Sequence, residues 1–182
     1  NNLGNIFLGL SRLDDAVDHF EWAVAYKPDF VEAHNNLGNT FLSIGKLDDA
    51  VKSYEKTITL KPDYAEAHNN LGIVFHQLGQ LDAAVKSLKE ALTIKPDYDK
   101  AHNNLGNAFN ALGQSDDAIK CYEKALAINP DYAVAHNNLG VVLKDLGQLD
   151  DAVKSYEKAL TIKPDYVEAQ NNLDIVLKEL NS

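Results

Sequence analysis

Three observations predict an all-α fold, a solenoid of antiparallel helix pairs. The segment Ala-His-Asn-Asn-Leu-Gly occurs at residues 33–38, 67–72, 101–106 and 135–140, always 34 residues apart. All five prolines keep the same interval. Each interval also holds two stretches of apolar residues at helical spacing, and such a repeat buries its apolar faces against its neighbours. We therefore expect an elongated stack without a central core.

The repeat period sets the expected domain organisation. We predict one array over residues 1–182, with a clipped first repeat at 1–28, full repeats at 29–62, 63–96, 97–130 and 131–164, and a C-terminal capping helix at 165–182. The cap is inferred from Asp174, which stands where the repeats have glycine, because a carboxylate there is tolerated only if the site is open to water. The chain begins inside a repeat without methionine, so we interpret it as a segment of something longer.

Residues 63–96 illustrate the expected unit. Asp63 is predicted to be the N-cap of a first helix over 65–78, with Glu66 completing a capping box. A glycine at position 79 is expected to end that helix, and a second helix is predicted over 81–94. Gly72 and Ala84 are interpreted as small residues that let the two helices approach closely, because a helical glycine otherwise costs roughly 1 kcal/mol.

Composition excludes several classes of function. The net charge of −10 argues against nucleic acid as a partner, since phosphate binding needs a basic surface. No apolar run is long enough to span a membrane. The acidic residues are interpreted as a solvated surface, with Asp48 at a helix start and Lys52 four residues later as one ion pair. Cys121 is the only cysteine, so no intrachain disulfide is possible, and a cytoplasmic location is favoured.

We expect no catalytic, cofactor-binding or metal-binding residues. Four histidines recur at the repeat interval: His34, His68, His102 and His136. Ligands of one metal ion lie within about 4 Å of each other, whereas equivalent residues of stacked repeats are roughly 10 Å apart. The histidines are therefore interpreted as packing residues. No phosphate-binding glycine loop or nucleophile motif occurs, so the segment is not expected to be an enzyme.

The offsets of the repeated residues resemble the tetratricopeptide repeat family. In residues 63–96 the matching positions are His68, Leu71-Gly72, Phe75, Ala84, Leu88, Ala91 and Pro96. Histidine stands where the family often has tryptophan, and Leu88 replaces the aromatic residue of the other repeats. The resemblance implies a right-handed solenoid whose first helices line a concave groove. It also implies a scaffold that binds a protein or peptide.

Paired asparagines on the first helices are the main candidate for that binding. Asparagine is a mediocre helix former, so its recurrence in the middle of helices needs a reason. One interpretation is that the amides tie neighbouring helices together. The other is that they hold an extended peptide by its backbone, which offers one donor and one acceptor per residue. The expected groove residues are Asn35, Asn36, Asn39, Asn69, Asn70, Asn103, Asn104, Asn107, Asn137, Asn138 and Lys144.

The margin of the groove is expected to give a ligand direction. One position changes from apolar to charged along the repeats, in the order Leu8, Leu42, His76, Asn110, Lys144, Lys178. The asparagine frame is also similar to that of the tetratricopeptide arm of O-linked N-acetylglucosamine transferases, which points to Asn36, Asn70, Asn104 and Asn138. The alternative function is therefore the recognition arm of a transferase whose catalytic domain is absent. Trp22 is a candidate for self-association through the first repeat.

Overall fold

The computed structural model describes residues 2–181, and for Asn2 it describes the backbone alone. The described residues form eleven α-helices and no strand, which confirms the all-α fold class. The chain divides into two compact units, one ending at Pro96 and the other beginning at Asp97. The division falls at a repeat boundary expected from the sequence.

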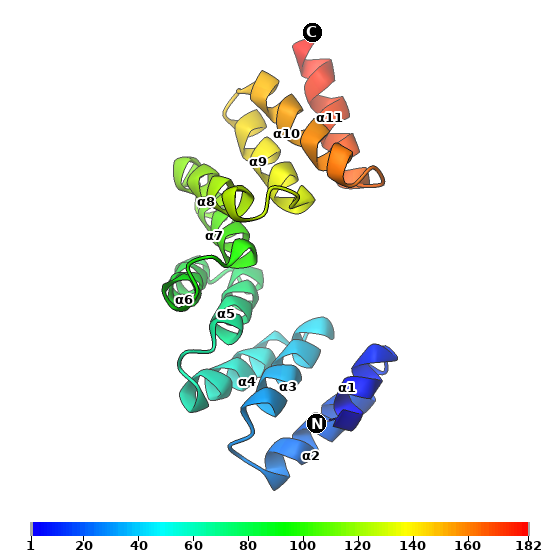
Figure 1. Ribbon diagram of the computed structural model, residues 1–182, viewed down its shortest axis with the longest axis vertical. Helices are drawn as coiled ribbons and strands as arrows, with labels where there is room; N and C mark the ends of the chain where they lie inside the picture. The colour runs from blue at the N-terminus through cyan, green and yellow to red at the C-terminus, as the bar shows by residue number, and fades with distance from the viewer. Residues whose placement is uncertain (1, 182) are drawn as a thin grey trace. The chain divides into compact units, whose positions relative to one another are not determined.

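Both units are built from helix pairs (Figure 1). The first unit holds α1 (Asn2–Gly9), α2 (Leu13–Tyr26), α3 (Val31–Ser43), α4 (Leu47–Leu60), α5 (Ala65–Gln77) and α6 (Leu81–Ile94). The second holds α7 (Asp99–Ala111), α8 (Ser115–Ile128), α9 (Ala133–Asp145), α10 (Leu149–Ile162) and α11 (Val167–Leu180). We call the odd-numbered helices first helices and the even-numbered ones second helices.

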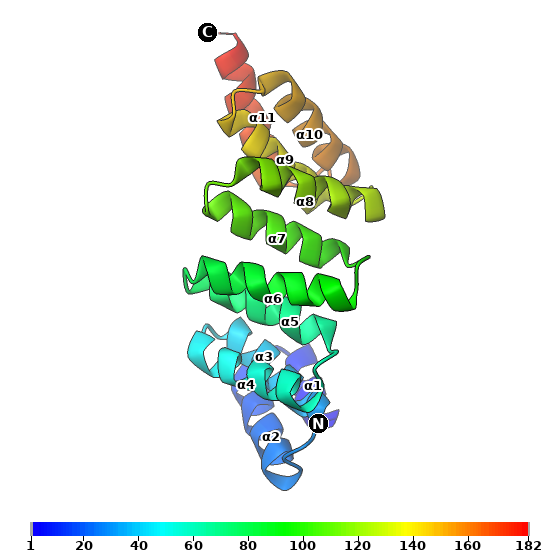
Figure 2. The same ribbon diagram turned by 90° about the vertical axis from the view of Figure 1, so that its left-hand side faces the viewer.

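Within each unit every helix packs against the next one along the chain. First helices also contact each other directly, at α3–α5 in the first unit and at α7–α9 and α9–α11 in the second. Figure 2 shows α4 and α6 toward the viewer, with α3 and α5 behind them. The first helices therefore form one face of each unit and the second helices another.

The helix starts correct one prediction. Asp63 is not an N-cap, because α5 begins at Ala65 and the capping position is Tyr64, which makes no side-chain cap hydrogen bond. Asp63 lies one residue earlier, in the turn after the proline, where its carbonyl accepts a hydrogen bond from the Ala65 amide at 3.2 Å. The other full repeats show the same shift, with aromatic capping residues Phe30, Tyr98 and Tyr132. The capping box is therefore absent from these helices.

The helix ends agree with the prediction. Gly79 has a φ of +73°, and its amide donates to the carbonyl of His76 at 3.0 Å. The amide of Gln80 donates to the carbonyl of Phe75 at 2.8 Å, which completes the expected C-terminal hydrogen-bond pattern. The later repeats have glycine in the same conformation. Ser11 takes that position after α1, with a φ of +57°.

The helical glycines do allow close packing, but against a different neighbour from the one expected. A Cβ added at Gly38 would lie 2.7 Å from the ring of Tyr54, and one at Gly72 would lie 2.6 Å from Leu88. The glycine therefore makes room for the large buried residue of the second helix. The alanines Ala50 and Ala84 are fully buried as well, so the small side chains on both helices are part of the core.

The surface ion pairs differ from the expected ones. Lys52 bonds Asp49, three residues earlier, at 2.9 Å, and not Asp48. Equivalent pairs join Lys120 to Asp117 and Lys154 to Asp151. These pairs are exposed, so each contributes little to stability. In α6 the equivalent of Asp49 is Ala83.

Candidate functional site

The first asparagine of each pair is buried within the helix stack. Asn35, Asn69, Asn103 and Asn137 have exposed fractions of 0–3%. Asn69 donates to the Asn70 side chain at 3.0 Å, and Asn137 donates to Glu168 on α11 at 3.1 Å. A ligand cannot reach these amides without displacing helices. We therefore remove these four residues from the expected groove.

Asn36, Asn70 and Asn138, each the second asparagine of its pair, are half-buried and bond the preceding first helix of the same unit. Asn36 Nδ2 donates to Asn5 Oδ1 at 3.0 Å, and Asn70 Nδ2 donates to Asn39 Oδ1 at 2.9 Å. Asn138 Nδ2 donates to both Asn103 Oδ1 at 3.0 Å and Asn107 Oδ1 at 3.1 Å. Asn104 has the same register in α7 and is half-buried. The amides of Asn36, Asn70 and Asn138 tie successive first helices of one unit together, in line with one of the two interpretations drawn from the sequence.

Tyrosines of the second helices complete this network. The hydroxyl of Tyr54 donates to Asn39 Oδ1 at 2.7 Å, and that of Tyr122 donates to Asn107 Oδ1 at 2.9 Å. Asn39 and Asn107 each therefore accept hydrogen bonds from two neighbouring helices. Burial raises the pKa of both tyrosines, so the hydroxyls remain protonated donors. The sequence reasoning missed this role, although asparagine and tyrosine do recur fifteen residues apart in these two repeats.

The network is interrupted in two other repeats. In the repeat 63–96 both positions are apolar, Ile73 and Leu88. In the repeat 131–164 the tyrosine remains as Tyr156, but Val141 has replaced the asparagine. The Tyr156 hydroxyl is buried and has no hydrogen-bond partner within residues 2–181. Burial, followed by the nearby charges of Asp145 and Glu168, raises the pKa of Tyr156 to about 12.

The recurring histidines have structural partners. His34, His68 and His136 each bond the carbonyl of the proline six residues earlier, at 2.9–3.0 Å through Nε2. A carbonyl only accepts, so Nε2 carries the proton. The contact fixes the start of each first helix to the preceding turn, in agreement with a packing role. Among the described residues no group of three or more His, Cys, Asp or Glu side chains could hold a metal ion.

The remaining predicted groove residue is Lys144 on α9. Its side chain is half-buried, and Nζ lies 3.3 Å from the carboxylate of Asp145.

In the described residues no helix is both long and apolar enough to cross a membrane. What the first-helix face offers is therefore amide hydrogen bonding with an ammonium group at its margin.

The sequence profile of the family described as TPR repeat matches residues 4–45, 38–79, 74–113 and 106–147. The profile described as tetratricopeptide repeat matches residues 133–166. The chain belongs to the tetratricopeptide repeat (TPR) family. No curated protein sequence matches it.

Solved TPR structures resemble this chain over most of its length. MamA is 29% identical, with 91% of this chain and 96% of MamA covered and a TM-score of 0.80. TTC0263, a thermophilic TPR protein of Thermus thermophilus, is 27% identical, with 97% and 96% covered and a TM-score of 0.80. YrrB, described as a TPR protein with an unusual peptide-binding site, is 22% identical, with 93% and 88% covered and a TM-score of 0.73. The last comparison supports the fold alone.

Proposed function

We propose that this TPR chain is a non-catalytic scaffold that binds an extended peptide or partner segment along its first helices. The proposal is carried by the second asparagines of the pairs. They are half-buried, and the amides of Asn36, Asn70 and Asn138 are fixed by hydrogen bonds to the preceding first helix. A side chain that is already ordered loses less entropy when a ligand binds to it.

The network determines which part of each amide a ligand can use. In Asn138 the two Nδ2 contacts occupy both amide protons, and the structure shows no partner for Oδ1 within its described residues. That oxygen is available to accept a peptide N–H. In Asn70, Oδ1 accepts from Asn69, and Nδ2 faces both Asn39 Oδ1 and the Tyr54 hydroxyl. An amide oxygen that accepts a backbone N–H, as in Asn138, selects little for the side chains of a peptide.

The similarity to YrrB is consistent with this proposal, because that protein is described as having a peptide-binding site. The margin of the first-helix face changes from apolar to charged along the repeats, so the two ends of a bound peptide would meet different side chains. Leu42 in α3 is replaced by Lys144 in α9 at the equivalent position. An acidic or carboxylate-bearing end of the peptide would be attracted to Lys144. We expect that orientation within the second unit.

The recognition arm of a glycosyltransferase is the second candidate function. The asparagine frame favours it, since Asn36, Asn70, Asn104 and Asn138 match the frame of the O-linked N-acetylglucosamine transferase arm. Both candidates use the same face and the same kind of ligand. A transferase domain encoded in the same reading frame would favour the arm.

The test replaces Asn36, Asn70, Asn104 and Asn138 by alanine. Peptides are first selected from a random library on the wild-type chain and are then titrated calorimetrically against both proteins. Each lost amide–peptide hydrogen bond weakens binding by about 0.5–1.5 kcal/mol, so four lost bonds reduce affinity by at least about thirtyfold. The control variant replaces Lys56, Lys124 and Lys158 by alanine. These lysines are exposed on second helices, so the control should bind the peptides with the affinity of the wild-type chain.

The helix ties lost in the asparagine variant lower its stability, and circular dichroism identifies the temperatures at which it remains folded. Titrations are made at those temperatures only. Unchanged affinity in the folded variant would contradict the proposal, as would a library that yields no peptide.

A further inference from the structure

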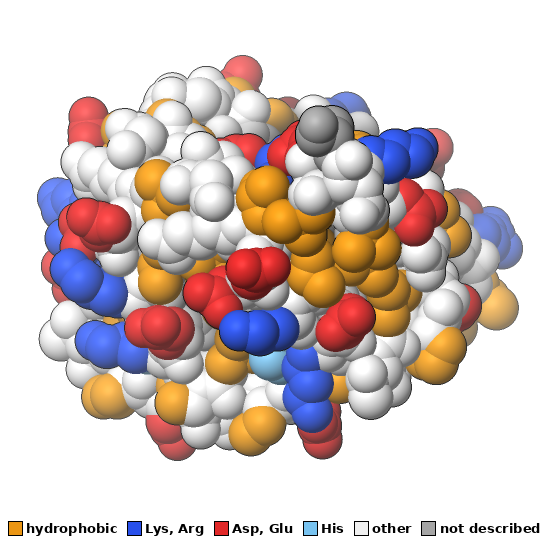
Figure 3. All heavy atoms as spheres, turned by 90° about the horizontal axis from the view of Figure 1, so that it is seen from above, with side chains coloured by type: hydrophobic (Ala, Val, Ile, Leu, Met, Phe, Trp, Pro, Cys, Tyr) orange, Lys and Arg blue, Asp and Glu red, His pale blue; other side chains and the backbone are white. Residues whose placement is uncertain are grey.

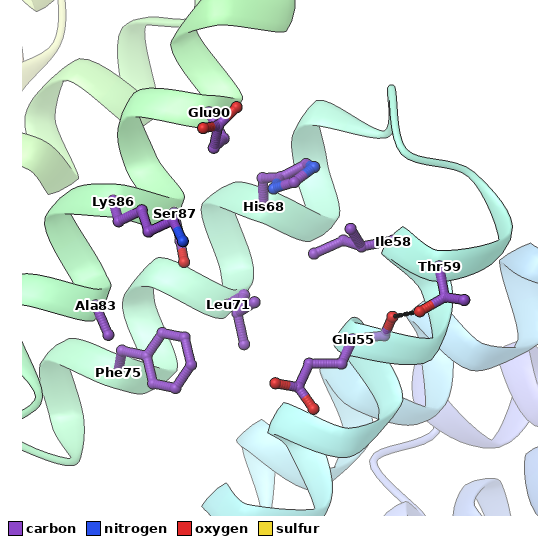
Figure 4. A pocket seen from close by; sticks show the side chains of 10 residues that line it. All are labelled: Glu55, Ile58, Thr59, His68, Leu71, Phe75, Ala83, Lys86, Ser87 and Glu90. Atoms are coloured by element: carbon purple, nitrogen blue, oxygen red, sulfur yellow. Dashed lines mark hydrogen bonds between the residues drawn. The ribbon is translucent and has the colours of Figure 1, made fainter.

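A pocket lies on the second-helix side of the first unit, away from the asparagine network. It has a volume of about 590 Å³ and is formed by α4, α5 and α6. Figure 4 shows Leu71 and Phe75 of α5 between the side chains of α4 and α6. With Ile58 of α4, these residues make an apolar floor of partly or largely buried side chains. The volume falls within the range of about 300–1,000 Å³ found for ligand pockets and is large enough for a few side chains.

Three charged side chains line this pocket. Glu55 extends from α4 and Glu90 from α6, on opposite walls, and Lys86 lies on the α6 wall (Figure 4). None of the three has an ion-pair partner among the described residues. Two carboxylates and one ammonium give the pocket a formal charge of −1. A single additional cation would balance it.

This charge arrangement is specific to one repeat. The position of Glu90 holds Lys56, Lys124 and Lys158 in the other full repeats. The position of Ala83 holds an aspartate in those repeats, and that aspartate pairs with the lysine equivalent to Lys86. At the equivalent positions α2 and α4 carry Glu21 and Lys56, α8 and α10 carry Glu123 and Lys158, and α6 and α8 carry two lysines, Lys89 and Lys124. Here two glutamates face the same apolar space.

We propose that this pocket, which we call the α4–α6 pocket, docks a segment of another protein that carries a lysine or arginine beside apolar side chains. The apolar neighbours would cover Ile58, Leu71 and Phe75. The cation would lie between Glu55 and Glu90, where the two exposed carboxylates attract it beside an apolar floor. The site lies on a different face from the asparagines and does not depend on the proposed peptide-binding function.

The test uses two capped peptides that have one central residue between leucines. The central residue is lysine in the probe and norleucine in its neutral counterpart. Both are titrated into the ¹⁵N-labelled chain and followed by amide chemical shifts. The lysine peptide should shift amides of α4, α5 and α6 around the pocket. It should bind about two- to fivefold more tightly than the norleucine peptide, which is the scale of favourable charge contacts near a surface.

Two charge-matched variants make the test specific. Glu90→Lys installs the residue that the other full repeats carry, so the fold accepts it, and it should abolish the preference for lysine. Glu157→Lys makes the same charge change on α10, at the register where α6 has Lys89, and should keep the preference. Equal affinity for both peptides would overturn the proposal. So would a lysine preference that survives in Glu90→Lys, or shifts confined to the first-helix asparagines.

Discussion

Replacing each buried tyrosine by phenylalanine tests the hydrogen-bond network with three equivalent substitutions. Tyr54→Phe and Tyr122→Phe remove hydroxyls that donate to asparagine at 2.7 and 2.9 Å. Tyr156→Phe removes a buried hydroxyl that has no partner. Phe20 occupies the equivalent position in the first repeat and is fully buried, so the ring without a hydroxyl fits the site.

The expected effects have opposite directions. Loss of a buried hydrogen bond costs about 0.5–1.5 kcal/mol, so Tyr54→Phe and Tyr122→Phe should each lower the free energy of unfolding by that amount. An unpaired buried hydroxyl is itself destabilising by about 1–3 kcal/mol, so Tyr156→Phe should leave stability unchanged or raise it. For a chain of this size, 1 kcal/mol changes the thermal midpoint by about 2–4 °C.

Scanning calorimetry of the three variants and the wild type measures these differences. Val141→Asn provides the complementary variant, because it gives Tyr156 the acceptor that Asn39 gives Tyr54, and it should raise the midpoint. The reasoning is refuted if Tyr156→Phe destabilises the chain as much as Tyr54→Phe does.

Three further predictions concern the ends of the chain and its response to pH. Trp22 and Tyr26 are 69% and 80% exposed and stack with ring centroids 5.6 Å apart, so Trp22→Lys should reduce self-association in sedimentation; identical monomeric profiles would exclude this patch. Asp174 is exposed and accepts a hydrogen bond from Gln170 at 2.9 Å, and a consensus second helix appended after it should stabilise the chain only together with Asp174→Gly; equal gains in thermal midpoint would contradict the capping role. Tyr156 has its ordinary pKa of about 10 in the unfolded chain, whereas burial raises the pKa to about 12 in the folded chain. The free energy of unfolding therefore falls as the pH rises from about 10 toward about 12. Tyr156→Phe should reduce the fall of the thermal midpoint between about pH 9 and pH 11, the range around the ordinary tyrosine pKa.

The exposed apolar residues of the last helix were not predicted from the sequence. Figure 3 looks down on the end that carries α11 and shows hydrophobic side chains in patches between charged ones. Ile175, Leu177 and Leu180 of α11 are all exposed. Of the polar residues on this helix, Asp174 was interpreted in the sequence as a sign of a cap. Their apolar neighbours are exposed because no second helix of the described chain covers this side of α11.

The repeat period was sufficient to predict the helices. The second helix over 81–94 was predicted at its observed bounds, and the first helix over 65–78 is one residue shorter. Glycine, proline and apolar spacing are local signals that act in the same way in every repeat. Asp63 was misassigned as an N-cap because the helix starts at Ala65, as predicted, so the residue in the capping position is Tyr64.

The side-chain network could be predicted only in part. Asn35 and Asn36 are adjacent, and residues that are neighbours on a helix point in directions about 100° apart, so both cannot face one groove. The sequence did not show which of the two is buried. The α4–α6 pocket depends on two exceptions, Ala83 and Glu90, and on the space between second helices, which no single repeat reveals.

The central claim, that the second asparagines hold a peptide, is tested most directly by the side-chain amide signals in a ¹H–¹⁵N spectrum. A library-selected peptide is titrated into the ¹⁵N-labelled chain. The side-chain signals of Asn70 and Asn138 should shift with the same saturation curve as the binding measured calorimetrically. Those of the buried Asn35 and Asn137 serve as internal controls and should move much less. Saturable peptide binding that leaves the signals of Asn70 and Asn138 unchanged would contradict the account.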